Sequence, residues 1–189
     1  MKTITNAQLL DELSADTRGI ILFAEQLKAR AESEMIRQRN DGGWSAAQVL
    51  YHLNVYSQYY LPAIEKAISG NPPSGYSFKP GLLGNYFTGL MGTDASGMVK
   101  KKMKSPKNAV PPPVIHVKES LNEFLQHQHH LLNLLEIVRS VHLGKVRIPV
   151  SIAKFIRMKL GDTLRFYIEH EKRHVKQMER VLEITSPRA

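Results

Sequence analysis

Apolar residues that recur every three or four positions run through most of this chain, and this helical periodicity constrains its fold more than any other feature. Between residues 5 and 40 the repeat is carried by six apolar side chains: Leu9, Leu10, Leu13, Ile20, Phe23 and Leu27. The pattern stops at the NDGG sequence of residues 40–43. Because asparagine and glycine are typical of helix ends, we expect one long helix within residues 5–40.

Three further long helices are predicted. The second begins at Ser45, a good N-cap that forms a capping box with Gln48, and runs to Ser69 with a kink at Pro62. The third covers residues 117–141, a Gly/Pro break at 144–149 leads to a short turn of helix, and the last helix runs from Asp162, as N-cap, to Glu183. No segment shows convincing strand alternation.

Residues 70–113 differ from the rest of the chain. The sequences NPPSGYSFKPG and SPKNAVPPP frame an apolar stretch, GLLGNYFTGLMG, that can form one short helix. A connection this long is usually functional or disordered, and we expect either a lid over a site or a dimer contact. The predicted fold class is therefore all-α, a single-domain four-helix bundle over residues 1–189 with 70–113 as the crossover between the second and third helices.

The formal charge of +9 is concentrated in two segments. Residues 97–118 carry six lysines and no acid, and residues 139–165 carry seven lysines or arginines against Asp162 alone. The run KKKMKSPK has no aromatic residue to stack on bases, which argues against nucleic acid and favours a solvated basic loop. No apolar run is long enough to span a membrane and no signal-peptide core is present, so we expect a cytoplasmic protein without a membrane partner.

The chain has no cysteine, so a metal must be held by His, Asp or Glu. The last helix contains the sequence HEKRH, in which His170 and His174 are four residues apart and therefore project side by side. At 100° per residue, His174 falls within the apolar stripe of that helix and His170 at its rim, while Glu171 falls near its centre. Two hydrogen-bonded core histidines with a tethered glutamate are the simple alternative to a metal site.

A third ligand is needed for a tight site, and His52 in the second helix is the best candidate. It lies on the flank of an apolar stripe and would complete a three-His site if it faced the other pair across the bundle. His127, His129 and His130 compete less well, because the last two angle away from the apolar stripe of the third helix. Gln128 points into that stripe. It either supports the metal ligands from behind or is a hydrogen-bonded amide in the core.

The letters HEKRH also fit the zinc-protease motif H-E-x-x-H. Such proteases need a third ligand downstream of this helix, but only fifteen residues follow His174, and Glu179 and Glu183 point away from the stripe. No convincing strand is available to hold a peptide by strand addition. We therefore reject a protease.

Two separated motifs resemble the DinB-like superfamily, the DNA-damage-inducible protein B and YfiT-type bundles. GGWSAAQVLYHL is similar to the family's W-S-x-x-E-x-L-x-H-L element, with Gln48 in place of the common Glu, and EHEKRHVKQMERV to its late H-x-x-x-H-x-x-Q element. The resemblance implies a divalent metal, zinc or nickel, bound by His52, His170 and His174. It also implies a homodimer.

The resemblance implies one of the family's chemistries, which include S-transfer with a low-molecular-weight thiol such as bacillithiol and metal-dependent hydrolysis. We therefore expect a metal-dependent enzyme for a small-molecule substrate, in which the ion activates a thiol or water and Glu171 orients a ligand or accepts a proton. The alternative is a non-catalytic metal- or ligand-binding stress-response module. The sequence does not choose between these functions.

Overall fold

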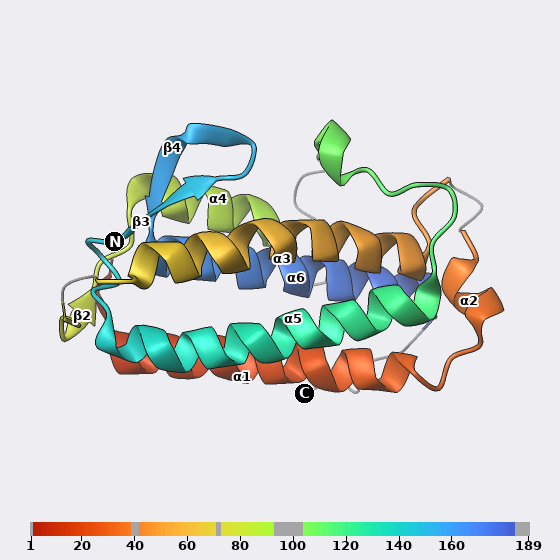
Figure 1. The fold of residues 1–189 in the computed structure, drawn as a ribbon, viewed down its shortest axis with the longest axis horizontal. Helices are drawn as coiled ribbons and strands as arrows, with labels where there is room; N and C mark the ends of the chain where they lie inside the picture. Colours follow the sequence, from red (N-terminus) through yellow and green to blue (C-terminus); the bar gives the residue numbers. More distant parts are fainter. Residues whose placement is uncertain (1, 39–41, 71–72, 93–103, 184–189) are drawn as a thin grey trace.

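The computed structural model describes residues 2–38, 42–70, 73–92 and 104–183, and within them four long helices lie side by side (Figure 1). These are α1 (Asn6–Leu27), α3 (Ala46–Ile68), α5 (Val117–Ile137) and α6 (Leu160–Val181). Helices α1 and α3 each pack against both α5 and α6, so the four enclose one core. The predicted all-α four-helix bundle is confirmed.

The core is made of the apolar faces that the helical periodicity predicted. Its largest fully buried side chains include two tyrosines, one phenylalanine and several leucines of the four helices: Tyr60, Tyr167, Phe124, Leu10, Leu50 and Leu131.

No helix in the described parts of the chain is both long and apolar enough to cross a membrane.

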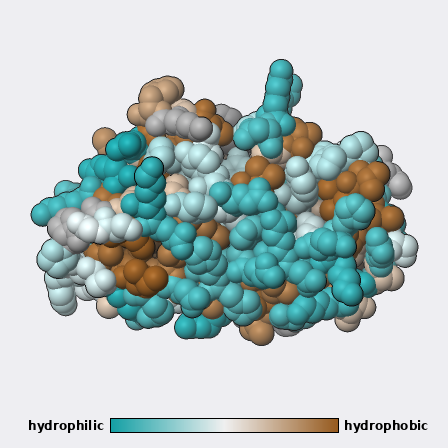
Figure 2. Space-filling model, in the orientation of Figure 1, coloured by the Kyte–Doolittle hydropathy of each residue, from teal (hydrophilic) through white to brown (hydrophobic). Residues whose placement is uncertain are grey.

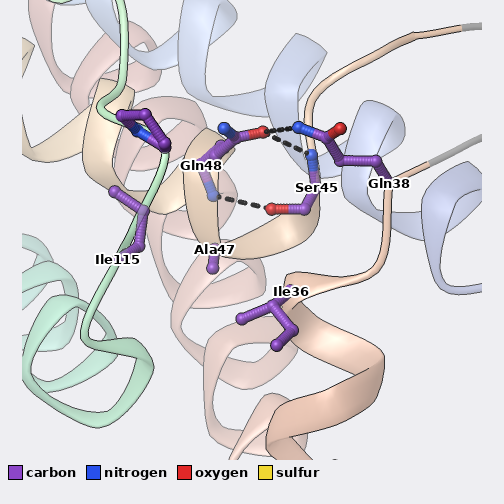
Figure 3. Close-up of a pocket in the computed structure, with 7 residues that line it drawn as sticks. Ile36, Gln38, Ser45, Ala47, Gln48 and Ile115 are labelled. Atoms are coloured by element: carbon purple, nitrogen blue, oxygen red, sulfur yellow. Dashed lines mark hydrogen bonds between the residues drawn. The ribbon is translucent and has the colours of Figure 1, made fainter.

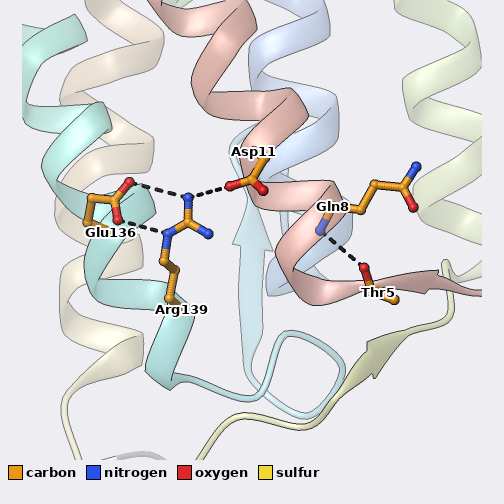
Figure 4. Close-up of polar contacts among 5 residues, drawn as sticks. All are labelled: Thr5, Gln8, Asp11, Glu136 and Arg139. Atoms are coloured by element: carbon orange, nitrogen blue, oxygen red, sulfur yellow. Dashed lines mark hydrogen bonds and ion pairs between the residues drawn. The ribbon is translucent and has the colours of Figure 1, made fainter.

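Polar contacts outside the core position the helix ends. The predicted capping box is present, because Ser45 accepts from Gln48 N and the Gln48 side chain accepts from Ser45 N. The Arg139 guanidinium, just past the end of α5, bridges Asp11 of α1 and Glu136 of α5 (Figure 4). In the same view, the Thr5 hydroxyl caps α1 by accepting from Gln8 N, whose side chain is drawn beside it.

Four observed helix boundaries differ from the predicted ones. The first helix ends at Leu27 and is followed by the separate short helix α2 (Glu32–Ile36), while α5 ends at Ile137 in the 3-10 turn η2 (Val138–Ser140). Helix α6 begins at Leu160 and ends at Val181, with Lys159 at the N-cap. Asp162 is therefore no cap: its carboxylate instead accepts a hydrogen bond of 2.9 Å from Gly81 N, far away in the sequence.

The absence of strands was also wrong. Strands β3 (Arg147–Val150) and β4 (Ala153–Lys159) form an antiparallel hairpin where a short helical turn was predicted, and β1 (Ile4–Thr5) pairs with β2 (Ser77–Phe78). Within β3, Ile148 and Val150 are buried and Arg147 is exposed, which is strand alternation. This alternation gives only a weak signal in the sequence, because it spans few residues and contains Pro149, which usually argues against a strand.

The described part of segment 70–113 holds the predicted short helix, α4 (Leu82–Met91), and the 3-10 turn η1 (Lys107–Ala109). Helix α4 lies outside the bundle and packs on α6. Arg165 of α6 donates to Asn85 Oδ1 of α4 over 2.7 Å, and Arg173 donates to Leu90 O. The first half of the KKKMKSPK run (residues 100–103) lies outside the described residues.

Candidate metal centre

Three histidine side chains from two helices converge inside the bundle. His52 is on α3, and His170 and His174 are one turn apart on α6. One ring nitrogen from each histidine lies within 4.8 Å of the others, close enough to share a metal ion. The side chains are 3%, 4% and 9% exposed respectively, so the candidate site is shielded from bulk water.

The outer ring nitrogens of two of these histidines are held by hydrogen bonds. His52 Nδ1 lies 2.8 Å from the Ala109 carbonyl, and His174 Nδ1 lies 2.9 Å from Gln177 Oε1. Because a carbonyl oxygen only accepts, both Nδ1 atoms carry the proton and both Nε2 atoms keep a free lone pair. His52 Nε2 faces His170 Nε2 at 3.3 Å. Fixing Nδ1 in this way is how proteins orient metal-binding histidines.

Aromatic rings surround the cluster. The Trp44 and His52 ring centroids are 5.0 Å apart, and those of Tyr56 and His170 are 4.3 Å apart. Phe166 stacks on His170 at 6.2 Å. These apolar faces replace water around the imidazoles and lower the local dielectric, which strengthens any bond to a bound cation.

Burial keeps the three imidazoles neutral. Desolvation lowers the pKa of His52, lowers that of His174 to about 3, and holds the pKa of His170 well below its usual value. Only a neutral imidazole can bind a metal ion. The buried His170 Nδ1 has no hydrogen-bond partner among the described residues. The donor set thus fits a divalent ion that prefers nitrogen ligands.

Glu171 faces a different part of the core. Gln128 of α5 donates to Glu171 Oε1 over 2.7 Å, and nearby Tyr167 and Ser57 share a hydrogen bond of 2.7 Å. In the described part of the chain no hydrogen bond joins Glu171 to the three histidines. Burial raises the pKa of Glu171 to about 8, although the hydrogen bond from Gln128 opposes the shift.

This raised pKa predicts a pH dependence of stability. Between about pH 4.5 and 8 the folded protein keeps the Glu171 proton that the unfolded chain has lost, so the unfolding free energy falls as the pH rises through this window. Glu171→Gln has no carboxyl group at this position, so its unfolding free energy should not show this fall with rising pH. Relative to the variant, the wild type should therefore lose a few kcal/mol of stability between pH 5 and 9, with a slope of about 1.4 kcal/mol for each tenfold fall in proton concentration.

Urea denaturation of both proteins at several pH values measures this difference. The histidines are common to both, so their titration cancels. Glu119→Gln, on the exposed surface of α5, is the matched control. The difference in unfolding free energy between the wild type and this variant should stay constant over the same pH range. A wild-type minus Glu171→Gln difference that is constant with pH would mean that Glu171 is already ionised at neutral pH.

The other histidines of the third helix are not part of the cluster. His127 contacts Asn54 Oδ1 at 3.2 Å, and His130 pairs with Glu65 at the surface. His129 is exposed. Sequence reasoning missed the Ala109 carbonyl that orients His52, since a main-chain ligand to a distant side chain leaves no signal in residue type.

A pocket of about 390 Å³ opens near the start of α3 (Figure 3). Its walls come from α2 and the following segment, from α3, and from the segment before α5: Ile36, Gln38, Ser45, Ala47, Gln48, Pro113 and Ile115. None of the three histidines lines it, although Gln48 lies one turn before His52. The Gln48 side chain in the wall of this pocket accepts hydrogen bonds from Ser45 N and from the Gln38 side chain (Figure 3).

A four-helix bundle with three converging buried histidines defines the class of this protein. The chain belongs to the DinB superfamily, whose family model matches residues 8–178. The fold is similar to that of YfiT from Bacillus subtilis, described as a probable metal-dependent hydrolase with an unusual four-helix bundle topology. That match has a TM-score of 0.55 and 14% sequence identity, and covers 91% of this chain and 85% of the other. No curated protein is significantly similar in sequence.

Proposed function

We propose that this chain is a metal-dependent enzyme in which His52, His170 and His174 hold a divalent zinc or nickel ion. The observation that carries the proposal is the convergence of three buried, neutral imidazoles with ring nitrogens within 4.8 Å. Carboxylates that could close such a site with a fourth protein ligand are not grouped with the histidines in the described parts of the chain. Three protein ligands with open positions are typical of catalytic rather than structural sites.

The residues around the cluster have distinct roles in this proposal. A divalent ion bound there would lower the pKa of a water or thiol and so provide a nucleophile at neutral pH. The Ala109 carbonyl and Gln177 orient two of the rings. Glu171 binds Gln128 rather than a histidine, which favours a positioning role over that of proton acceptor. Trp44 and Tyr56 exclude water from the imidazoles.

Hydrolysis and thiol S-transfer both use these residues, and the substrate is a small molecule in either case. The description of YfiT as a probable hydrolase favours hydrolysis. Transfer of a low-molecular-weight thiol such as bacillithiol is supported only by the basic surface, since such thiols carry carboxylates. The homodimer and the cytoplasmic location stay predictions.

Metal content tests the proposal. Elemental analysis of protein purified without a His-tag should find about one zinc or nickel per chain in the wild type, in line with a three-ligand site. The His52→Ala, His170→Ala double variant should lose it. His129→Ala with His130→Ala, which removes two surface histidines, is the matched control and should keep it.

The alternative is a non-catalytic binding module, and the same proteins distinguish it. Hydrolysis of small esters and amides, and thiol transfer, are screened with metal-loaded wild type and with His52→Ala. An enzyme shows activity in the metal-loaded wild type that His52→Ala loses while it stays folded, whereas a non-catalytic module binds metal in the wild type and shows activity in neither protein. Absence of metal from the wild type, even after reconstitution, would refute the enzyme and return the histidines to a role in the core.

A further inference from the structure

Helix α4 and the β3–β4 hairpin form an additional layer outside the four-helix bundle. Both pack on α6, and they contact each other along one edge of the molecule (Figure 1). The inner side of this layer is apolar and buried, with Ile148, Val150 and Met158 from the hairpin and Met91 from α4. Its outer side carries exposed apolar and basic residues that have no role in the proposed chemistry.

Large apolar side chains point outward from this layer. Leu82 and Tyr86, four residues apart on α4, are 83% and 59% exposed. Phe155, near the hairpin turn, is 88% exposed, and Ile152 in the turn is 56% exposed. Figure 2 shows apolar atoms beside hydrophilic ones at the edge where Figure 1 places the hairpin. Helices that are apolar on all sides are normally covered, and exposed groups of this kind mark interaction sites.

The same layer is strongly basic. Residues 73–92 and 141–161 together contain six lysines or arginines and no aspartate or glutamate. Phe155, Arg157 and Lys159 alternate along β4 and therefore share its outer face. In the part of the chain that the structure describes, no carboxylate forms a salt bridge with Arg147, Arg157 or Lys159.

The strand register brings like charges together. Arg147 on β3 lies directly opposite Lys159 on β4. Like charges in this position destabilise a hairpin, and a bound anion would relieve the repulsion. The buried Asp162 carboxylate interacts electrostatically with both Arg147 and Lys159, but its single charge also faces Arg165 and accepts from Gly81 N.

We propose that this α4–hairpin face (Leu82, Tyr86, Phe155, Arg147, Arg157 and Lys159) docks onto the surface of an anionic lipid bilayer. The apolar tips would enter the boundary between headgroups and acyl chains while the cations meet the lipid phosphates. The sequence argument against a membrane partner rested on the length of apolar runs, which bears on spanning a bilayer and not on binding to its surface.

Charge and chemistry favour a bilayer over the other occupants. A second copy of the chain would bring the same cations against each other across the interface. Single-stranded nucleic acid would match the charge and stack on the aromatic rings. It would not bury the exposed aliphatic side chains of Leu82 and Ile152, whereas a bilayer would.

Co-sedimentation of the full chain with vesicles tests the docking. Vesicles of phosphatidylcholine alone are compared with vesicles in which one third of the lipid is phosphatidylglycerol. Binding is expected only to the anionic vesicles, and it should weaken as salt is added. Arg157→Gln should reduce the affinity about fivefold, and Phe155→Ser about tenfold, given the usual contributions of one cation and one buried ring.

Two surface variants on α1 are the matched controls. Arg18→Gln removes an exposed arginine and Leu22→Ser removes an apolar side chain that is 66% exposed. Neither should change vesicle binding. Because all four positions are exposed, each variant should unfold at the wild-type temperature, which thermal denaturation checks.

Three outcomes would overturn the docking. One is that no binding to anionic vesicles occurs at low salt. Another is that vesicles are not bound but sedimentation shows a dimer that Phe155→Ser dissociates, which makes the face a contact between copies. The last is binding of a single-stranded oligonucleotide, sensitive to Arg157→Gln, without vesicle binding. All these measurements are independent of metal content and so of the proposed function.

Discussion

His170→Ala is expected to weaken the binding of zinc or nickel by about a thousandfold or more, because the site loses one of only three protein ligands. The three imidazoles form a triangle, with ring centroids 5.3 Å apart for His52 and His170, 4.6 Å for His170 and His174, and 4.7 Å for His52 and His174. Two remaining ligands from different helices do not make a tight site. Competition against a chromophoric chelator measures the affinity of metal-free protein that is reloaded with each ion.

Gln177→Leu should give a smaller and distinct effect. Gln177 holds His174 Nδ1 at 2.9 Å without offering a ligand to the ion. Loss of such a partner typically costs about 10–100-fold in metal affinity, on the order of 2 kcal/mol. A metal affinity that falls from the wild type to Gln177→Leu, and falls further in His170→Ala, would show that Gln177 orients a ligand while His170 is one. Exposed His129 supplies the control, because His129→Ala should bind metal like the wild type.

Metal binding should also stabilise the fold. An ion present at about a thousand times its dissociation constant raises the unfolding free energy by about 4 kcal/mol if only the native state binds it. We expect this gain in the wild type and not in His170→Ala. An unchanged affinity or an unchanged metal-induced stabilisation in His170→Ala would exclude this cluster as the metal site.

Gly84→Ala is expected to destabilise the protein by about 2–4 kcal/mol or to detach α4 from α6, an effect of the size of core overpacking. A Cβ at position 84 would overlap the Cβ and Cγ atoms of Asp162, well inside van der Waals contact. These atoms are at the root of a short side chain that Gly81 N already binds, so they cannot move aside. The helix must therefore shift as a whole.

Gly89→Ala is the matched control within the same helix. A Cβ there would meet nothing within 4 Å, and alanine stabilises a helix by about 1 kcal/mol relative to glycine. The two substitutions are chemically identical, so opposite signs in urea denaturation would isolate the contact with Asp162. Equal effects at both positions would show that α4 does not pack on α6 as described.

The sequence alone determined the parts of this protein that depend on local physics. Helical periodicity placed the long helices, because each must bury one apolar stripe. The Ser45 capping box was readable since its two partners are three residues apart. The pairing of His170 with His174 followed in the same way from one turn of α6. His52 was proposed from its place on an apolar flank and from a family motif.

Only the tertiary structure decided how distant segments meet. The Ala109 carbonyl orients His52 from 57 residues away. Asp162 looked like a helix cap but joins α6 to the start of α4, 81 residues earlier in the chain. The sequence predicts that Glu171 orients a ligand or accepts a proton, and the packing of α5 on α6 decides that its hydrogen-bond partner is Gln128. Each of these contacts depends on packing between helices, which a periodic pattern in one segment does not encode.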